Sequence, residues 1–327
     1  MDTDLTGLHH VGLVVRDMGA AIDTFRRFGF RIGPPAYPAL PAVPGGRPEP
    51  VGAGNTHADF PRGFIELLAF AADRRDDLPA EARLVPLQVP DDHLAATRAA
   101  IGHTVAGLAA RLTRAQGAHI LVFASADAER TAARLTAAGV GHTGARPAQR
   151  PITTAEGTRL AAIEYLDISD DDPTGMLPEG RVGAAEDAPP ELLDAQIGLD
   201  HPNGAVGLTE CVLVAEDEGL GATADRYARY LDRTPTEYDR SRVFDLGPHR
   251  LTITTARGLA ERLPGERNSA ATALSAYAIE FTDLAATTQL LSDRGIELHQ
   301  GATGEPFIPA GAAHGAAIIL RQTATAT

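Results

Sequence analysis

The stretch LHHVGLVVRD at residues 8–17, continued by MGAAIDTFRRFGF at residues 18–30, decides the fold of this chain. Its first part has the side-chain alternation of a strand with two different faces, so His10 is expected on the face opposite to its two neighbours. Asp17 stands where a helix N-cap is preferred, and an apolar stripe then runs to Gly29, a residue type that often ends helices. The stretch therefore predicts a strand that leads directly into a helix.

The same pattern occurs three more times, at HILVFASAD (119–127), TECVLVAED (209–217) and AYAIEFTD (276–283). In the second and fourth copies, a Gly follows the Asp at the same distance as Gly29 follows Asp17. Unrelated segments would not keep this spacing, so the sequence predicts four repeated units of a strand, a helix and further strands.

The repeat predicts two domains, residues 1–198 and 199–327, because a single unit would leave one face of its sheet uncovered. Three segments do not repeat. Residues 33–54 are rich in Pro and Gly, which predicts a loop that cannot pair as a central strand. Residues 91–116 have apolar residues at helical spacing and predict a helix or a pair of helices that covers a domain or a dimer partner. Residues 169–206 are acidic and Pro-rich and contain the link between the domains.

Composition narrows the classes of function. The net charge is −14 at pH 7 and no Arg-rich stripe stands out, so we expect no nucleic-acid partner. Cys211 is the only cysteine, which leaves no disulfide framework and no thiolate zinc cluster. No run approaches about 20 apolar residues, so no membrane span is expected. The acidic residues after Met1 differ from a secretory signal, and we expect a cytoplasmic protein.

Two stretches of the first unit, residues 9–30 and GNTHADFPRGFIELLAF at residues 54–70, resemble the vicinal oxygen chelate superfamily, specifically its glyoxalase-like domain proteins. Residues 119–140 and 201–217 resemble the same group, and the resemblance covers most of the chain apart from residues 78–118. It implies an α+β protein with tandem glyoxalase/bleomycin-resistance/dioxygenase-like domains. Each domain would be built from βαβββ modules whose sheets pair into a cupped half-barrel around a metal or ligand site. The helical insertion is extra to this pattern.

The resemblance also implies metal ligands on the first and last strands of each module. His10 matches the first-strand position and Glu66 the last-strand carboxylate of the first module. An imidazole and a carboxylate suit Fe, Mn, Co, Ni or Zn. In the second module Ile120 stands at the position of His10 and cannot bind a cation. His119 is one residue away, on the opposite face of the strand unless a bulge intervenes.

The last strand of the second module has two interpretations. One places it at AAIEYLDI (161–168), with Glu164 near the ligand position. The other makes that run the third strand and places the last strand at GRVGAAED (180–187), with Glu186 or Asp187 near the ligand position. We favour the second, because the sequence that follows falls into step with it. The expected ligands are then His10, Glu66, and Glu186 or Asp187.

Two polar residues on the strand that precedes Glu66 are candidates for binding a substrate oxygen. Asn55 and His57 stand on the preceding strand, where they either point into the same cup or are hairpin-turn residues. In the third and fourth modules the first-strand positions hold Glu210 and Ala276, and neither last strand offers a carboxylate. We therefore expect no metal in the second domain.

Three features remain outside the expected metal site. The HPNGA stretch at residues 201–205 resembles a turn of the family and predicts a corner of the fold. Three scattered histidines are expected at the surface: His249, His299 and His314. The Pro/Gly-rich segment 33–54 is either a lid over the cup, as the resemblance implies, or a plain surface loop.

The leading hypothesis is an enzyme that acts on a small, oxygen-rich metabolite by metal-assisted proton transfer, as an isomerase, lyase or epimerase. Glu66 would move the proton, and a metal bound through His10 would hold neighbouring substrate oxygens. Ring-cleaving dioxygenase chemistry fits less well, because it requires two His and one carboxylate. No Gly-rich phosphate loop is present, so no nucleotide cofactor is expected. The alternative is a protein of the same fold that sequesters a small molecule without chemistry. A third hypothesis makes one domain mainly a scaffold for a homodimer.

Overall fold

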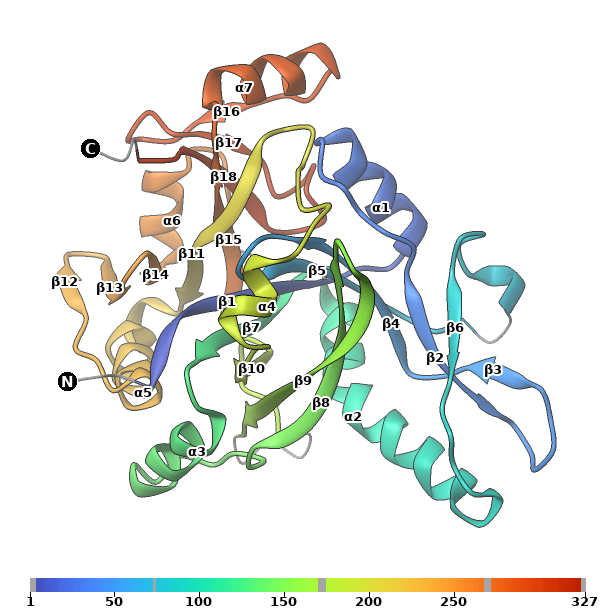
Figure 1. Ribbon diagram of the computed structural model, residues 1–327. Helices are drawn as coiled ribbons and strands as arrows, with labels where there is room; N and C mark the ends of the chain where they lie inside the picture. Colours follow the sequence, from blue (N-terminus) through green and yellow to red (C-terminus); the bar gives the residue numbers. More distant parts are fainter. Residues whose placement is uncertain (1–3, 73–74, 170–174, 268–271, 325–327) are drawn as a thin grey trace.

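The computed structural model describes residues 4–72, 75–169, 175–267 and 272–324. Four units of a strand, a helix and further strands follow one another along the chain (Figure 1). The first strands of the units join in antiparallel pairs, the first with the second and the third with the fourth. These strands are β1 (Leu5–Val14), β7 (Gly117–Ser125), β11 (Ala205–Ala215) and β15 (Ala273–Phe281). A bridge between Ala118 and Leu274 connects the two pairs.

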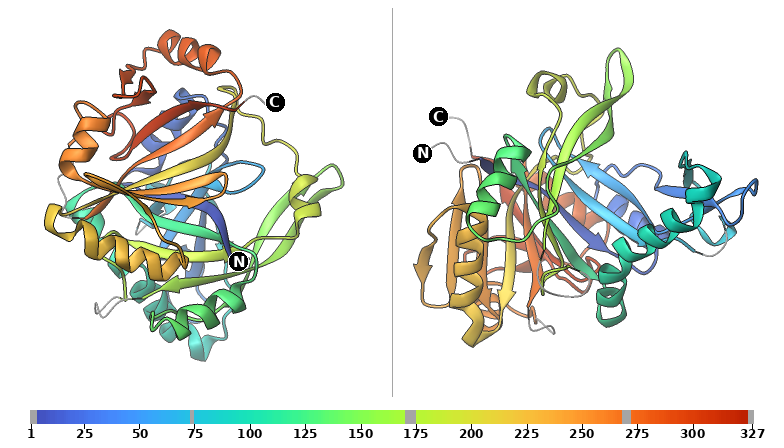
Figure 2. Two further views of the ribbon diagram at one scale, coloured as in Figure 1. Left: turned by 90° about the vertical axis from the view of Figure 1, so that its left-hand side faces the viewer. Right: turned by 90° about the horizontal axis from the view of Figure 1, so that it is seen from below.

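Each unit ends in a strand that runs parallel to its own first strand. These strands are β5 (Phe64–Phe70), β10 (Arg181–Glu186), β14 (His249–Thr255) and β18 (Ala317–Gln322). The outer strands are β4 (Ala53–Asp59), β8 (Arg146–Thr154), β9 (Gly157–Ile168), β12 (Thr236–Tyr238), β13 (Ser241–Leu246), β16 (His299–Gln300) and β17 (Pro306–Ile308). Because β9 is antiparallel to β10, and β10 is parallel to β7, β10 is the last strand of the second unit. This is the second of the two sequence interpretations. The β8–β9 hairpin projects from the rest of the sheet (Figure 2).

The repeated Asp-to-Gly spacing marks the two ends of a ten-residue helix. The helices are α1 (Met18–Arg27), α3 (Ala128–Ala137) and α7 (Leu284–Asp293). In each, the Asp before the helix accepts a backbone hydrogen bond from the residue three positions later, for example Asp17 from the N–H of Ala20 at 3.0 Å. Gly29 follows α1 with φ +89°, a left-handed conformation that favours glycine, and its two counterparts do the same. The third unit differs, because α5 (Leu220–Leu231) follows a 3₁₀ turn (Asp217–Gly219).

One apolar core is shared by all four units. Side chains from the first strands pack there against the helices. Phe25 of α1 and four strand residues are fully buried in this core: Leu13, Phe123, Leu213 and Tyr277. The link before the third unit is fixed to the end of α1, because Asn203 donates a hydrogen bond to the carbonyl of Phe28 at 3.0 Å. His201 lies beside it and accepts from the N–H of Arg31. The predicted corner at residues 201–205 is therefore built of buried polar side chains.

A helix packs against each of the two other apolar faces of the sheet. In the first half, Leu108 of α2 (Leu94–Arg114) packs with Ile120 and Val122. In the second half, Leu259 of α6 (Ala256–Arg262) packs with Val212. We call these two faces the first and second cups. The first cup contains the residues that the sequence singled out.

The expectation of a loop at residues 33–54 is corrected by the structure. Strand β2 (Ala36–Pro41) lies between β3 (Pro48–Pro50) and β6 (Arg83–Pro86) and forms a small sheet at one side of the molecule (Figure 1). Pro38 is tolerated in β2 because only its carbonyl takes part in the pairing: this oxygen accepts from the N–H of Val51 at 2.9 Å. The N–H that proline lacks is not needed there. The segment pairs both within itself, β2 with β3, and with the distant strand β6, so it is not an irregular loop.

The insertion predicted at residues 91–116 is one helix. A short 3₁₀ turn (Asp91–His93) leads into α2, which continues through Gly102 and Gly107. Its two ends are anchored in different clusters, Leu94 with the small sheet and Leu108 with the first cup. Packing at both ends offsets the low helix propensity of the two glycines. The remaining short helices are 3₁₀ (Arg75–Asp77) and α4 (Pro190–Asp194).

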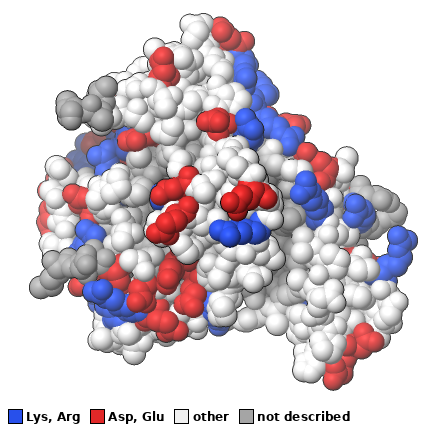
Figure 3. Space-filling model, in the orientation of Figure 1, with Lys and Arg blue, Asp and Glu red and all other residues white. Residues whose placement is uncertain are grey.

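In the described part of the chain, no helix has the length and apolar character needed to cross a membrane. On the face shown in Figure 3, acidic and basic side chains are interspersed.

Candidate functional site

His9 and His10 lie side by side because β1 has a bulge at this point. Along the β1–β7 pair, Leu8 is opposite Phe123 and His10 is opposite Val122, so His9 has no partner on β7. A bulge of this kind places two consecutive side chains toward the same side. The Nδ1 atoms of His9 and His10 are 2.8 Å apart. Simple alternation assigns His9 to the opposite face, and sequence reasoning therefore missed it.

A glycine immediately before the neighbouring strand β5 makes room for the bulge. Gly63 has φ +79°, and a Cβ placed on it would lie 2.0 Å from the carbonyl oxygen of His9. The second unit repeats the arrangement, since a Cβ on Gly180 would lie 2.1 Å from the carbonyl oxygen of His119. His119 itself does not join the first cup's polar group. Its Nε2 lies 3.0 Å from the carbonyl oxygen of Ala115.

The structure brings together three of the residues that the sequence selected. The Nε2 atom of His10 lies 4.0 Å from Oε2 of Glu66. Asn55 donates a hydrogen bond of 2.8 Å to the other carboxylate oxygen, Oε1. Oε2 is thus the oxygen that faces the imidazole. The side chains of His10 and Glu66 are 14% and 10% exposed, so a ligand in contact with them would be largely shielded from water.

Phe64 forms the aromatic wall of the site. Its ring stacks on His10 with centroids 4.4 Å apart and on His57 with centroids 4.2 Å apart. The guanidinium carbon of Arg150 lies 5.7 Å from the same ring centroid. The Phe64 ring therefore stands between His10 and His57, as β5 stands between β1 and β4. Nδ1 of His57 lies 3.8 Å from the carboxylate of Asp59.

The surroundings of His10 disfavour its protonated form. Burial lowers the pKa of His10 well below its ordinary value, and the basic side chains around it lower that pKa further. A neutral imidazole can act as a hydrogen-bond acceptor or a metal ligand.

Glu186 and Asp187 have partners of their own. Glu186 accepts a hydrogen bond of 2.9 Å from the N–H of Ala128, at the N-terminus of α3. Asp187 accepts from Arg150 at 2.8 Å, and the same oxygen lies 3.2 Å from Nε2 of His9. Burial alone would raise the pKa of Asp187, but the hydrogen bond from His9 and the charge of Arg150 outweigh it and lower that pKa. Asp187 thus contacts His9, which in turn contacts His10. Glu186 instead accepts a hydrogen bond at the N-terminus of α3.

Strand pairing identifies the positions in the second unit that match the first-unit pair. Glu66 is opposite Gly12, and the equivalent of Gly12 in the second unit, Val122, is opposite Gly183. Gly183 has no side chain that could bind a metal ion. There is also no room for one, because a Cβ on Gly183 would lie 2.3 Å from the carbonyl oxygen of Leu166. With Ile120 at the position of His10, the second unit supplies no ligand at either matching position. Among the described residues, no three His, Cys, Asp or Glu side chains gather as a metal-binding group.

The second cup contains an ion cluster at the equivalent position. Glu210 is fully buried and accepts from Arg262 at 2.8 and 2.7 Å, with further bonds from Arg321 and Thr252. Arg250 lies 3.2 Å from the same carboxylate. Burial would raise the pKa of Glu210, yet the surrounding guanidinium groups hold it far below the ordinary value. This carboxylate is fully engaged within the protein.

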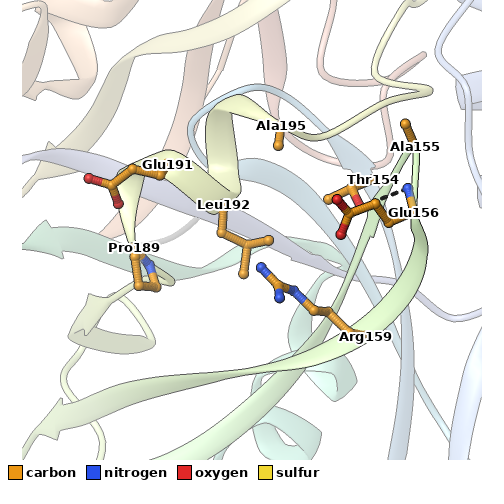
Figure 4. Close-up of a pocket in the computed structure, with 8 residues that line it drawn as sticks. All are labelled: Thr154, Ala155, Glu156, Arg159, Pro189, Glu191, Leu192 and Ala195. Carbon is orange, nitrogen blue, oxygen red and sulfur yellow. Dashed lines mark hydrogen bonds between the residues drawn. The ribbon is translucent and has the colours of Figure 1, made fainter.

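A cavity of about 1160 Å³ adjoins the other side of the His9–Asp187 pair. Leu160, Glu164 and His249 are among its lining residues, together with His9 and Asp187. His249 was expected at the surface but is partly buried, because its ring packs against Gly7 on β1. Figure 4 shows a neighbouring pocket of about 380 Å³ between the turn of the β8–β9 hairpin and α4, with Arg159 at its edge.

The fold and the site define the class of the protein. Paired βαβββ units around a cup are the fold of the vicinal oxygen chelate superfamily, and the first cup carries a His–Glu pair at the expected positions. Residues 8–231, more than half of the chain, match the family described as Glyoxalase-like domain. The chain belongs to this glyoxalase-like domain family.

Solved structures share the fold at low sequence identity. A hypothetical protein from Staphylococcus aureus aligns with a TM-score of 0.60 and 11% identity, over 97% of this chain and 99% of that one. A Mn(II)-bound glyoxalase from Novosphingobium aromaticivorans aligns with a TM-score of 0.49 and 11% identity, over 98% of this chain and 83% of that one. A triple mutant of 4-hydroxymandelate synthase from Streptomyces coelicolor aligns with a TM-score of 0.49 and 15% identity, over 91% and 77%. No curated protein sequence matches the chain.

Proposed function

We propose that the chain is an enzyme that moves a proton on a small, oxygen-rich metabolite in the first cup, as an isomerase or lyase. One observation carries the proposal: His10 and Glu66 direct two polar atoms at the same point, 4.0 Å apart, inside a largely buried cup. Two such groups at a shielded point are the minimum for general acid–base chemistry. We propose a small molecule as the ligand and the cytoplasm as the location of the protein. We also propose that the protein forms a homodimer.

Glu66 is the proposed proton acceptor. Asn55 donates to Oε1 and leaves Oε2 to take a proton from a carbon next to a substrate carbonyl. The electron pair of the broken C–H bond then moves onto the carbonyl oxygen as an enolate. Glu66 returns the proton to a neighbouring atom and completes an isomerisation. His57 and Asn55 are the proposed contacts for the substrate oxygens, because both lie on β4, next to Glu66 on β5.

A divalent ion (Fe, Mn, Co, Ni or Zn) fits part of this site. His10 and Glu66 would hold it, since an imidazole and a carboxylate both present lone pairs to the 4.0 Å gap; Oε2 of Glu66 would then be a ligand, and it could accept a proton only after leaving the ion. Bound there, it would polarise a substrate oxygen as a Lewis acid. The chain offers two ligands in place of the usual three or four, because the matching positions are Ile120 and Gly183. Glu186 and Asp187 are engaged elsewhere, so we do not include them among the ligands.

Solvent-exchange NMR tests the enzyme proposal. Small 2-oxo and 2-hydroxy acids would be incubated with the protein in D₂O, and deuterium uptake at the carbon next to the carbonyl would be measured. We expect uptake with the native chain and its loss in His10→Ala and Glu66→Gln, both still folded by circular dichroism. His142→Ala is the matched control, because His142 contacts Thr136 outside the cup. Full exchange in both site variants would contradict the proposal.

The alternative is a protein that binds a small molecule without reacting with it. The observation that favours it is the loss of ligand positions at Ile120 and Gly183. Ligand binding by the native chain without deuterium uptake, unchanged in Glu66→Gln, would support this alternative. Elemental analysis of protein purified without chelator, compared between the native chain and His10→Ala, determines whether an ion is held at the site.

A further inference from the structure

Four side chains form a continuous chain through the first cup. Asp187 contacts Nε2 of His9 at 3.2 Å, and Nδ1 of His9 contacts Nδ1 of His10 at 2.8 Å. Nε2 of His10 then faces Glu66 across 4.0 Å. Asp187 comes from the end of β10, whereas the other three residues belong to the first unit. The second unit therefore reaches the proposed site through His9.

Asp187 determines which nitrogen of His9 carries a proton. An ionised carboxylate is an acceptor only. The N–H of Ala188 donates to one oxygen of Asp187 at 2.7 Å, and Arg150 donates to the other at 2.8 Å. These donors favour the ionised form. The oxygen bonded to Arg150 also faces Nε2 of His9, so Nε2 of His9 is the donor in that contact.

The same reasoning determines the tautomer of His10. The two Nδ1 atoms are at hydrogen-bond distance and share one proton. The distance from His10 to Glu66 shows where this proton lies. Nε2 of His10 is 4.0 Å from Oε2 of Glu66, so Nε2 carries the lone pair, Nδ1 of His10 is the donor and Nδ1 of His9 is the acceptor. An N–H group on Nε2 would bond to a carboxylate at about 2.9 Å, whereas two acceptors stay apart, as they do at 4.0 Å.

We propose that His9 and Asp187 are positioning residues, which hold His10 in the Nδ1–H tautomer with its Nε2 lone pair facing Glu66. The proposal deepens the proposed function, because this lone pair is what a metal ion or a substrate hydroxyl would bind. The tautomer itself exists without any substrate. The second unit, which supplies no ligand at its own matching positions, thus acts on the site by fixing the imidazole of the first unit.

Nitrogen-15 NMR of histidine-labelled protein tests the tautomer directly. Two-bond correlations between ring protons and ring nitrogens distinguish protonated from unprotonated nitrogens, and the variants His9→Gln and His10→Gln assign the two rings among the eleven histidines. In the native chain we expect His10 to be protonated at Nδ1 and His9 at Nε2. Protonation of His10 at Nε2 in the native chain would overturn the proposal without any need for a further variant.

Asp187→Ala removes the acceptor that begins the chain. We expect His10 in this variant to lose its single tautomer, and Asp187→Glu to recover it. Glu164→Gln is the matched control, because Glu164 lines the same cavity, whereas the hydrogen bonds of the His9 ring go to His10 and Asp187. A native-like His10 pattern in a folded Asp187→Ala protein would show that Asp187 does not position the imidazole.

Titration with Mn(II) gives a second readout. If the lone pair of His10 is held in place by Asp187, the affinity for the metal alone should fall about 10- to 100-fold in Asp187→Ala. Equal affinities would overturn the positioning role. These measurements are separate from the proposed reaction: deuterium uptake can be absent while the tautomer is as expected, and the tautomer can be wrong while uptake is present.

Discussion

A Cβ atom on Gly12 would lie 2.7 Å from Oε2 of Glu66 and 2.8 Å from Cβ of Ile120. The carboxylate of Glu66 thus lies over a strand position that has no side chain. Gly12 is opposite Glu66 in the β1–β5 pair, so the space is created by the partner residue itself. The position of the Glu66 carboxylate therefore depends on this glycine as well as on the hydrogen bond from Asn55.

Gly12→Ala should disable the site while the protein still folds. The added methyl group displaces Oε2 of Glu66 and presses on Ile120, and such overpacking costs about 1–3 kcal/mol of stability. We expect deuterium uptake to fall at least as far as in Glu66→Gln. Gly33→Ala is the control, because an added Cβ meets nothing there. Native uptake in Gly12→Ala would show that the position of Oε2 is not critical.

The bulge at His9 makes a second prediction. Gly63→Ala would place a Cβ against the backbone of β1 and would force a left-handed φ on alanine. We expect a loss of stability of at least about 2 kcal/mol, measured by urea unfolding. Gly102→Ala is a useful contrast, because it lies exposed in α2 with free space around it and should stabilise the chain by up to about 1 kcal/mol. Equal effects of the two substitutions would contradict the structural role of Gly63.

These two glycines mark the limit of what the sequence could predict. Asp17 and Gly29 defined a helix because capping is local chemistry, and the same local signals located the other units. His10 and Glu66 could be selected because each stands inside an apolar run with a family resemblance. His9 could not, since the bulge arises from the pairing of β1 with β7. Residues 33–54 were misjudged for a similar reason: β2 is stabilised by β6, which lies more than 40 residues later.

Glu186 and Asp187, at the end of β10, should differ in role: Glu186 contributes to stability, and Asp187 positions His9. Glu186→Gln should lower stability by about 0.5–1 kcal/mol, because the charged oxygen at the N-terminus of α3 is lost. We expect no change in Mn(II) affinity or deuterium uptake. The comparison is Asp187→Ala, which should change both. A loss of Mn(II) affinity in Glu186→Gln would return Glu186 to the set of candidate ligands.

The ion cluster of the second cup predicts how stability depends on pH. The native pKa of Glu210 lies far below the unfolded value of about 4.5, so between these two values the unfolded chain binds more protons than the folded one. The contribution of Glu210 to stability is therefore complete above the unfolded pKa and is lost as the pH falls toward the native pKa. Glu210→Gln should cost about 3 kcal/mol near neutral pH, because the surrounding guanidinium groups lose their shared partner. Thermal unfolding across the acid range would also show a weaker pH dependence than in the native chain. Glu218→Gln is the matched control, since Glu218 is exposed and outside the cluster. If Glu210→Gln keeps the native acid sensitivity, other carboxylates are responsible for it and the cluster is not the main acid-labile element.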